Sequence, residues 1–182
     1  MSRNYKIQNK EGVYFITFST VEWVDVFTRK SYRDILIESI KHCQREKGLV
    51  VYSWCLMSNH VHMIVRSSNG DLSGTIRDLK KFTSKQILNE IQHSNQESRK
   101  DWMLEIFKKA GVNNSNNQNY QFWRQDNRPI EIFSNDVIDQ KMNYVHQNPV
   151  EAGLVENAED YLYSSARDYA GIKGLIDIEF LD

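Results

Sequence analysis

Two histidines separated by one residue, His60 and His62, are the first candidates for chemistry in this sequence. They open the run HVHMIVRS (60–67), whose β-branched and apolar residues are typical of a strand. Side chains alternate between the two faces of a strand, so both imidazoles should lie on one face and Val61 on the other. Such a pair can bind one metal ion. The alternative is two partly exposed strand histidines with no ligand role.

A predicted helix near the C-terminal end supplies residues that could complete a site. It should be capped by Ser134 or Asn135 and end at Asn148-Pro149, because a proline disfavours helical conformation in the residue before it. At about 100° per residue, Tyr144 and Asn148 share one stripe, whereas His146 lies on the far flank. We therefore expect Asn148, rather than His146, to be the third metal ligand. The stripe expected to face the core consists of Ile138, Met142, Val145 and Pro149.

Tyr144 would have a chemical role next to such a metal. A phenol is a poor nucleophile unless a metal ion polarises the phosphate that it attacks. With a divalent ion held by His60, His62 and Asn148, the tyrosine could attack a phosphodiester and leave a phosphotyrosine link. The alternative is a tyrosine that packs at the edge of the core.

Basic and aromatic residues elsewhere suggest contacts with nucleic acid. The predicted helix 71–92 carries basic residues four apart on the side away from its apolar face, a pattern that can follow a phosphate backbone. A tryptophan and two arginines within 120–132 could add base stacking and phosphate contacts. The alternatives are a solvated helix face and a core tryptophan. The candidate DNA-binding residues are Arg77, Lys81, Lys85, Trp123, Arg124 and Arg128.

The predicted elements follow the order strand, helix, strand, strand, helix, strand. This is the order of the split βαβ, ferredoxin-like fold. We therefore expect an α+β chain with a four-stranded antiparallel sheet, helices on one face and an additional C-terminal helix. The strands are expected at Val13–Thr20, at Leu49–Met57 and His60–Ser67 (a hairpin), and within Tyr120–Ile132; the connecting helices are expected from an N-cap at Ser31 to Lys47 and at Asp71–Gln92.

The formal net charge of −1 hides an asymmetry along the chain. Residues 1–149 contain 21 basic and 16 acidic residues, a net charge of +5, whereas residues 150–182 contain 2 and 8, a net charge of −6. We expect 1–149 to form the functional domain and 150–182 to form a separate acidic tail with a final strand at Leu175–Leu181. This tail should compete with DNA for the basic surface. The stretch 94–119 contains a short helix near Asp101–Lys109 and the tract NNSNNQN, and should be an insertion or a mobile loop.

The composition is typical of a folded, water-soluble protein. With 182 residues, 12% aromatic and 26% charged, the chain can bury a core and does not resemble a disordered protein. It has no apolar run long enough to cross a membrane, and its first residues lack the apolar core of a signal peptide. Cys43 and Cys55 fall in a helix and a strand pattern, so we expect buried thiols and a cytoplasmic location.

Four segments resemble one known family. WCLMSNHVHMIV (54–65) resembles the HUH motif of single-tyrosine (Y1) transposases, and YVHQNPVEAGLV (144–155) resembles their tyrosine helix, most closely that of REP-associated tyrosine transposases. FWRQDNRPIEI (122–132) and YLYSSARDYAG (161–171) are similar to the stretches that flank this helix. The resemblance covers nearly the whole chain, with two separate motifs in the order that the family shows.

This resemblance implies a transposase-type endonuclease and strand transferase. Tyr144 would cleave single-stranded DNA and form a 5′-phosphotyrosine, while His60, His62 and Asn148 would hold Mg²⁺ or Mn²⁺. The implied partner is single-stranded or hairpin DNA, such as a repetitive extragenic palindrome, bound by a monomer or a homodimer. Two other hypotheses remain open: a non-catalytic nucleic-acid-binding module on the same fold, and a metal hydrolase that activates water.

Overall fold

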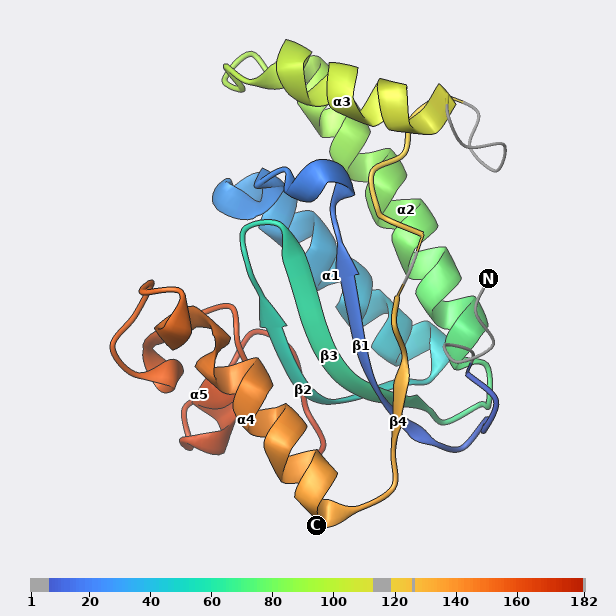
Figure 1. Ribbon diagram of the computed structural model, residues 1–182, viewed down its shortest axis with the longest axis vertical. Coiled ribbons are helices and arrows are strands. Elements are labelled where there is room, and N and C mark those ends of the chain that lie inside the picture. The colour runs from blue at the N-terminus through green and yellow to red at the C-terminus, as the bar shows by residue number, and fades with distance from the viewer. Residues whose placement is uncertain (1–6, 113–118, 126, 182) are drawn as a thin grey trace.

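A four-stranded antiparallel sheet forms the centre of the computed structural model (Figure 1). The structure describes residues 7–112, 119–125 and 127–181. The strand order is β2-β3-β1-β4, so the split βαβ, ferredoxin-like arrangement that the sequence predicts is confirmed. The strands are β1 (Val13–Ser19), β2 (Leu49–Leu56), β3 (His60–Ser67) and β4 (Ile130–Ile132).

Two helices cover one face of the sheet. α1 spans Lys30–Lys47 and α2 spans Leu72–His93, and both lie behind the strands in Figure 1. Alternate residues of β1 and β3 point to this face and form the main core with the two helices. These strand residues are all buried: Tyr14, Ile16, Phe18, Val61, Met63 and Val65.

The opposite face of the sheet is covered by α4, which spans Asn135–Glu151 and contacts β2 and β3. It lies in front of the strands in Figure 1. The predicted apolar stripe of this helix is confirmed, because Val145 and Pro149 are buried and Ile138 and Met142 pack beside them. The residues of β3 that alternate with Val61 and Met63 therefore face α4.

Two predicted helix boundaries were wrong. Ser31 lies inside α1, whose N-cap position is Arg29, so the expected serine cap is not formed. α4 begins after Ser134 as predicted but continues through Pro149 to Glu151. A proline removes one hydrogen bond of the helix, and at Pro149 that loss falls near the helix end and is accompanied by burial of the ring.

The strand predicted within 120–132 forms in two short pieces. Trp123 pairs with Thr20 in an isolated bridge, and Ile130–Ile132 pairs with Val13–Phe15. Between them Arg128 has a left-handed φ of 41°, which a regular strand does not accommodate. Pro129, which follows Arg128, has no amide hydrogen for the sheet and is consistent with this interruption.

Residues 94–112 pack against the core and are not a mobile loop, and the short helix predicted near Asp101–Lys109 is confirmed. α3 spans Lys100–Val112, and its Met103 and Phe107 are fully buried in the main core. Gly111 has a specific reason to lack a side chain, because a Cβ there would lie 2.7 Å from backbone atoms of Tyr120. Most of the NNSNNQN tract, residues 113–118, lies outside the described residues.

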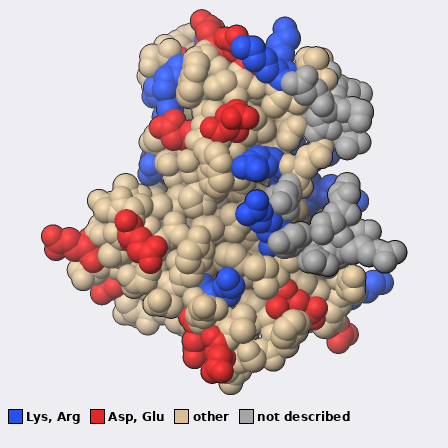
Figure 2. Space-filling view, in the orientation of Figure 1, with Lys and Arg blue, Asp and Glu red and all other residues tan. Residues whose placement is uncertain are grey.

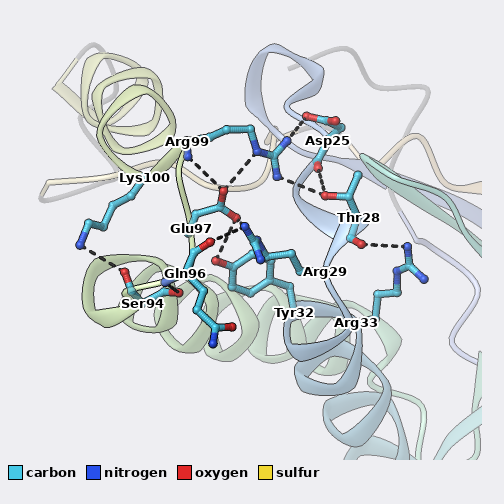
Figure 3. A network of polar contacts seen from close by, with 10 residues as sticks. All are labelled: Asp25, Thr28, Arg29, Tyr32, Arg33, Ser94, Gln96, Glu97, Arg99 and Lys100. Carbon is cyan, nitrogen blue, oxygen red and sulfur yellow. Dashed lines mark hydrogen bonds and ion pairs between the residues drawn. The ribbon is translucent and has the colours of Figure 1, made fainter.

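A buried carboxylate fixes the connection between α2 and α3 (Figure 3). The side chain of Glu97 is 0% exposed and lies 2.6 Å from Arg29 Nε and 3.2 Å from Arg99 Nε. Its Oε2 also accepts a hydrogen bond from the hydroxyl of Tyr32 at 3.3 Å, and Arg99 pairs with Asp25 at 2.8 Å. Burial raises the pKa of Glu97, but the hydrogen bonds from the two arginines outweigh it, so its pKa lies below the ordinary value.

Replacing this carboxylate should destabilise the protein. Glu97→Ala should lower the free energy of unfolding by about 2 kcal/mol, because the two guanidinium groups lose their shared partner. Glu105 on α3 is exposed and pairs with Lys109, so Glu105→Ala is a matched control that should have a much smaller effect. Urea unfolding of both variants measures the difference; equal midpoints would contradict a stabilising role for the Glu97 network.

The C-terminal segment is bound to the sheet and is not a separate tail. Ser164 pairs with Cys55 of β2, and the amide of Ser165 donates to the carbonyl of Trp54 at 2.9 Å. Tyr163 is part of the main core. The segment therefore covers the edge of β2, which would otherwise leave its backbone groups unpaired.

The end of this segment also differs from the prediction. Leu175–Leu181 does not form a strand, although the amide of Glu179 donates to the carbonyl of Val51 at 2.9 Å. Ile176 is 1% exposed in the main core. A truncation after Val155 would remove these core residues, so the acidic segment cannot be treated as a detachable competitor for DNA.

The two cysteines, Cys43 and Cys55, are buried free thiols, as the sequence predicts. Burial raises the pKa of Cys55 to about 12, so this thiol is not reactive at neutral pH. Within the described parts of the chain, each helix is too short or too polar to span a bilayer.

Candidate active site

β3 carries His60 and His62 in the interior of the sheet, on the face that α4 covers. The centroids of the two imidazole rings are 4.6 Å apart, and Val61 between them is 0% exposed on the opposite face. The prediction that both rings share one face is confirmed. Because β3 is hydrogen-bonded to β1 on one side and β2 on the other, the pair is held on a rigid support.

Hydrogen bonds orient both rings through their Nδ1 atoms. His60 Nδ1 lies 2.6 Å from Oδ1 of Asn59, and His62 Nδ1 lies 2.7 Å from Oγ1 of Thr17 on β1. An amide oxygen only accepts, so Nδ1 of His60 carries the proton and its Nε2 carries the lone pair. Nε2 of His62 is buried without a hydrogen-bond partner among the described residues. A buried nitrogen in this state is suited to ligate a metal.

Both imidazoles are held in the neutral form. Burial lowers the pKa of His62 to about 3, with further lowering from the nearby His60 and Lys141. Burial also lowers the pKa of His60, against a hydrogen bond with the Asn148 side chain that raises it. Metal binding requires neutral imidazole, so at neutral pH no proton has to leave before a cation binds.

α4 places Tyr144 and Asn148 against the histidines, as their spacing predicts. The ring of Tyr144 lies 5.1 Å from that of His62, centroid to centroid, and is 41% exposed. Asn148 hydrogen-bonds His60 through its side chain. Phe15 of β1 contacts both the His62 ring, at 5.7 Å, and the Tyr144 ring, at 6.0 Å. An accessible phenol thus lies beside two imidazoles and one amide.

These residues fit a divalent cation with a mixed set of ligands. Groups of three or more His, Cys, Asp or Glu side chains arranged to hold a metal are absent from the described residues. A cation bound here would need the Asn148 amide as a third protein ligand, together with His60 and the unpartnered Nε2 of His62. Nitrogen and neutral oxygen ligands leave the charge of the cation largely uncompensated, which suits an ion that must bind an anionic phosphate.

His146 does not join this group, as predicted from its position on the helix. Its Nε2 lies 2.8 Å from Oγ of Ser165 and 3.1 Å from Oγ of Ser53 on β2. Ser165 also donates to the carbonyl of Trp54. The histidine therefore connects the tyrosine helix to both the sheet and the C-terminal segment.

Acid should destabilise the protein partly through His146. Burial lowers its pKa to about 4, whereas an unfolded histidine has a pKa of about 6.5. Between these values the unfolded chain binds a proton that the folded chain does not, so stability falls as the pH is lowered through this window. Between pH 7 and pH 5 we expect His146 to cost on the order of 1 kcal/mol in the free energy of unfolding, a contribution that His146→Gln lacks. Urea midpoints of both proteins at the two pH values measure it. Equal pH dependence of the two proteins would contradict this role of His146.

Comparison with known proteins gives the family. The family model described as "Transposase IS200 like" matches residues 10–110, more than half of the chain. The chain belongs to the IS200-like transposase family. The matched region includes His60 and His62 and ends before α4, so it does not cover Tyr144 or Asn148.

A solved structure agrees with this fold. This IS200-like transposase superposes on a REP-associated tyrosine transposase bound to a REP hairpin with a TM-score of 0.66 and 19% identity, over 100% of this chain and 94% of the other. A second structure, described as a transposase from Deinococcus radiodurans R1, has a TM-score of 0.44 and 15% identity, over 80% of this chain and 94% of the other. None of the curated proteins matches significantly.

The predicted DNA-binding residues of this IS200-like transposase lie in different places. Trp123 is 4% exposed and donates from Nε1 to Thr83 Oγ1 at 3.0 Å, so it belongs to the core and cannot stack on a base. Arg124 and the exposed Arg128 follow it. The exposed stripe of α2, on the helix behind the sheet, consists of Arg77, Lys81 and Lys85. Arg77 pairs with Asp78.

Sequence reasoning missed several residues around the site. Thr17 and Phe15 of β1 contact His62, and the ammonium of Lys141 on α4 lies 5.1 Å from the centre of the Phe15 ring. Trp23 lies 5.7 Å from the His60 ring, centroid to centroid. The position of Lys141 on the Tyr144 stripe was a usable signal, whereas the neighbours from β1 depend on strand register.

Proposed function

We propose that this protein is a metal-dependent endonuclease and strand transferase for single-stranded DNA, with Tyr144 as its nucleophile. The main observation in support is that the side chains needed for this chemistry lie next to one another. An accessible tyrosine lies 5.1 Å from a buried imidazole, that imidazole has an unpartnered Nε2, and a second imidazole is hydrogen-bonded to Asn148. A structural tyrosine at the edge of the core requires neither the paired histidines nor the amide.

The proposed reaction takes its polarity from the resemblance to single-tyrosine transposases. Oη of Tyr144 attacks the phosphorus of a phosphodiester, a tyrosine–phosphate bond forms, and the bond from phosphorus to the 3′-oxygen of the departing strand breaks. The phenolic proton leaves to solvent and the released 3′-oxygen takes up a proton. The products are a 5′-phosphotyrosine and a free 3′-hydroxyl. Attack by another 3′-hydroxyl on the same link reverses the step and joins two strands.

His60, His62 and Asn148 would hold Mg²⁺ or Mn²⁺. A divalent cation there would neutralise negative charge on the phosphate oxygens as the bond to Tyr144 forms. The histidines contribute by remaining neutral at working pH, and Thr17 and Asn59 contribute by fixing the ring orientations. The ring of Phe15 excludes water from one side of Tyr144.

The substrate that we propose is a hairpin or palindromic DNA with a single-stranded flank. The similar REP-associated tyrosine transposase was solved with a REP hairpin. The net charge of +5 over residues 1–149 supports an anionic partner. Figure 2 shows acidic side chains on the lobe at the left, formed by the C-terminal segment, whereas basic and acidic side chains are mixed at the top and on the opposite side. We propose that Arg124 and Arg128 contact the single-stranded flank and that Arg77, Lys81 and Lys85 contact the duplex.

We also propose that one chain forms a complete site. Tyr144 contacts His62 of its own chain, and α4 is fixed to its own sheet by the apolar stripe and by His146. An arrangement in which a partner supplies the tyrosine would require α4 to detach from these contacts. Mixing a Tyr144→Phe chain with a chain that lacks the histidines tests this point, since only a shared site would restore activity.

The experiment that tests the proposed function uses purified protein and end-labelled hairpin DNA with single-stranded flanks. With Mn²⁺ we expect a labelled species that migrates with the protein on a denaturing gel, and with EDTA we expect none. An oligonucleotide library in the flank allows for the unidentified cleavage sequence. The proposal fails if no covalent species forms on any flank while the protein still binds the hairpin.

A further inference from the structure

Trp23 is an exposed aromatic residue that directly adjoins the candidate site. Its side chain is 51% exposed, and its ring centroid lies 5.7 Å from that of His60. The rings of Trp23, His60, His62 and Tyr144 follow one another, with successive centroid separations of 5.7, 4.6 and 5.1 Å. Trp23 is thus on the far side of the histidine pair from the tyrosine.

The backbone that presents Trp23 is strained. Glu22 and Trp23 have φ values of 50° and 56°, a left-handed conformation that non-glycine residues adopt rarely and at a cost of about 1–3 kcal/mol each. The buried residues Val21 and Val24 fix the two ends of this turn. Without the left-handed turn, this large apolar side chain would not project into solvent between two buried valines.

Hydrogen bonds tie the same turn to His60. Nδ2 of Asn59 donates to the carbonyl of Trp23 at 3.1 Å, while Oδ1 of Asn59 accepts from Nδ1 of His60 at 2.6 Å. The hydroxyl of Thr20 lies 2.8 Å from the carbonyl of Val24 and 3.1 Å from that of Asn59. One amide side chain therefore fixes Trp23 and His60 relative to each other.

A positive charge lies over the tryptophan. The guanidinium carbon of Arg124 is 5.6 Å from the centroid of the Trp23 ring. Two hydrogen bonds fix the backbone of Arg124. Its amide donates to the carbonyl of Ser19 at 2.9 Å, and its carbonyl accepts from Nζ of Lys80 at 2.7 Å. An exposed indole with an arginine beside it is suited to an aromatic ligand that also carries a phosphate.

We propose that Trp23 and Arg124 form a platform for the unpaired base next to the phosphodiester that Tyr144 attacks. The base stacks on the indole, and the guanidinium contacts the phosphate of the same nucleotide. This inference rests on the proposed function for its location beside the cleavage point. Its role would be to position the strand, since neither residue contacts the reacting atoms.

The test measures binding separately from cleavage. In a Tyr144→Phe background, fluorescence anisotropy gives the Kd for fluorescein-labelled dT12 and for an oligomer of the same length made of abasic sites. Stacking is worth about 1–3 kcal/mol per base, so Trp23→Ala should weaken dT12 binding by about tenfold and leave binding of the abasic oligomer unchanged. Trp23→Phe should retain most of the affinity. Trp102, 50% exposed on α3, provides the matched control, and Trp102→Ala should bind both oligomers like the parent protein.

A second arm separates this inference from the proposed function. In the chain that retains Tyr144, Trp23→Ala should lower the yield of covalent adduct at subsaturating DNA. At high DNA concentration the yield should return to that of the parent protein. Equal dT12 affinities for Trp23→Ala and Trp102→Ala, with normal adduct formation, would overturn the platform and leave the nuclease proposal intact. Absence of any adduct with the parent protein, despite tryptophan-dependent binding of dT12, would overturn the nuclease proposal instead.

Discussion

Replacing Tyr144 with phenylalanine should abolish covalent attachment of the protein to hairpin DNA while changing the Kd for that DNA by less than about threefold. The substitution removes only the hydroxyl oxygen that would attack phosphorus. The phenyl ring keeps its contacts with His62 and Phe15, so the site should retain its shape. The measurement is a denaturing gel of labelled hairpin incubated with Mn²⁺, together with anisotropy for the affinity.

Tyr120 provides the control for this variant. It is a partly buried tyrosine that packs against the main core, so Tyr120→Phe removes a hydroxyl away from the site and should form the adduct normally. Two outcomes would contradict the assignment of Tyr144. An undiminished adduct in Tyr144→Phe would point to another nucleophile, and metal-dependent cleavage without any adduct in that variant would favour a hydrolase that activates water.

Loss of both histidines should remove the metal together with the activity. In the double variant His60→Ala, His62→Ala we expect adduct formation to fall at least a thousandfold, because the cation would lose two of its three protein ligands. Titration calorimetry with Mn²⁺ alone, without DNA, gives a readout that does not depend on cleavage. The heat of binding seen with the parent protein should disappear.

The exposed His93 at the end of α2 supplies a matched control for the histidine pair. His93→Ala removes an imidazole that is remote in the fold and should bind Mn²⁺ and form adduct like the parent protein. Unchanged Mn²⁺ binding in the double variant would show that His60 and His62 are not ligands. Loss of activity with full retention of Mn²⁺ binding would mean that the histidines act on the DNA instead.

The parts of the site that follow from local periodicity were predictable. Alternation along β3 placed His60 and His62 on one face, and helical spacing placed Tyr144 and Asn148 on one stripe while excluding His146. Both patterns depend on a repeat within a single element. The order of elements then restricted the fold to the split βαβ arrangement, but α4 lies outside that unit, so its packing on β2 and β3 was not predicted.

The remaining features depend on contacts between residues far apart in the chain. Trp123 was predicted to stack on a base because its segment is polar, but it is buried against Thr83 and the aromatic core. The helix near Asp101–Lys109 was predicted but its burial in the main core was not, and Glu97 gives no local sign that it will be buried between two arginines. The exposure of Trp23 depends on a left-handed turn without glycine, which composition does not reveal.

The covalent link itself provides the most direct test. After incubation of the unmodified protein with hairpin DNA and Mn²⁺, nuclease and protease digestion followed by tandem mass spectrometry should find a nucleotide attached to the peptide that contains YVHQNP (144–149). We expect a phosphodiester link between the oxygen of Tyr144 and the 5′-phosphate of the DNA. A nucleotide on any other residue, or intact Tyr144 peptide from gel-purified adduct, would contradict it.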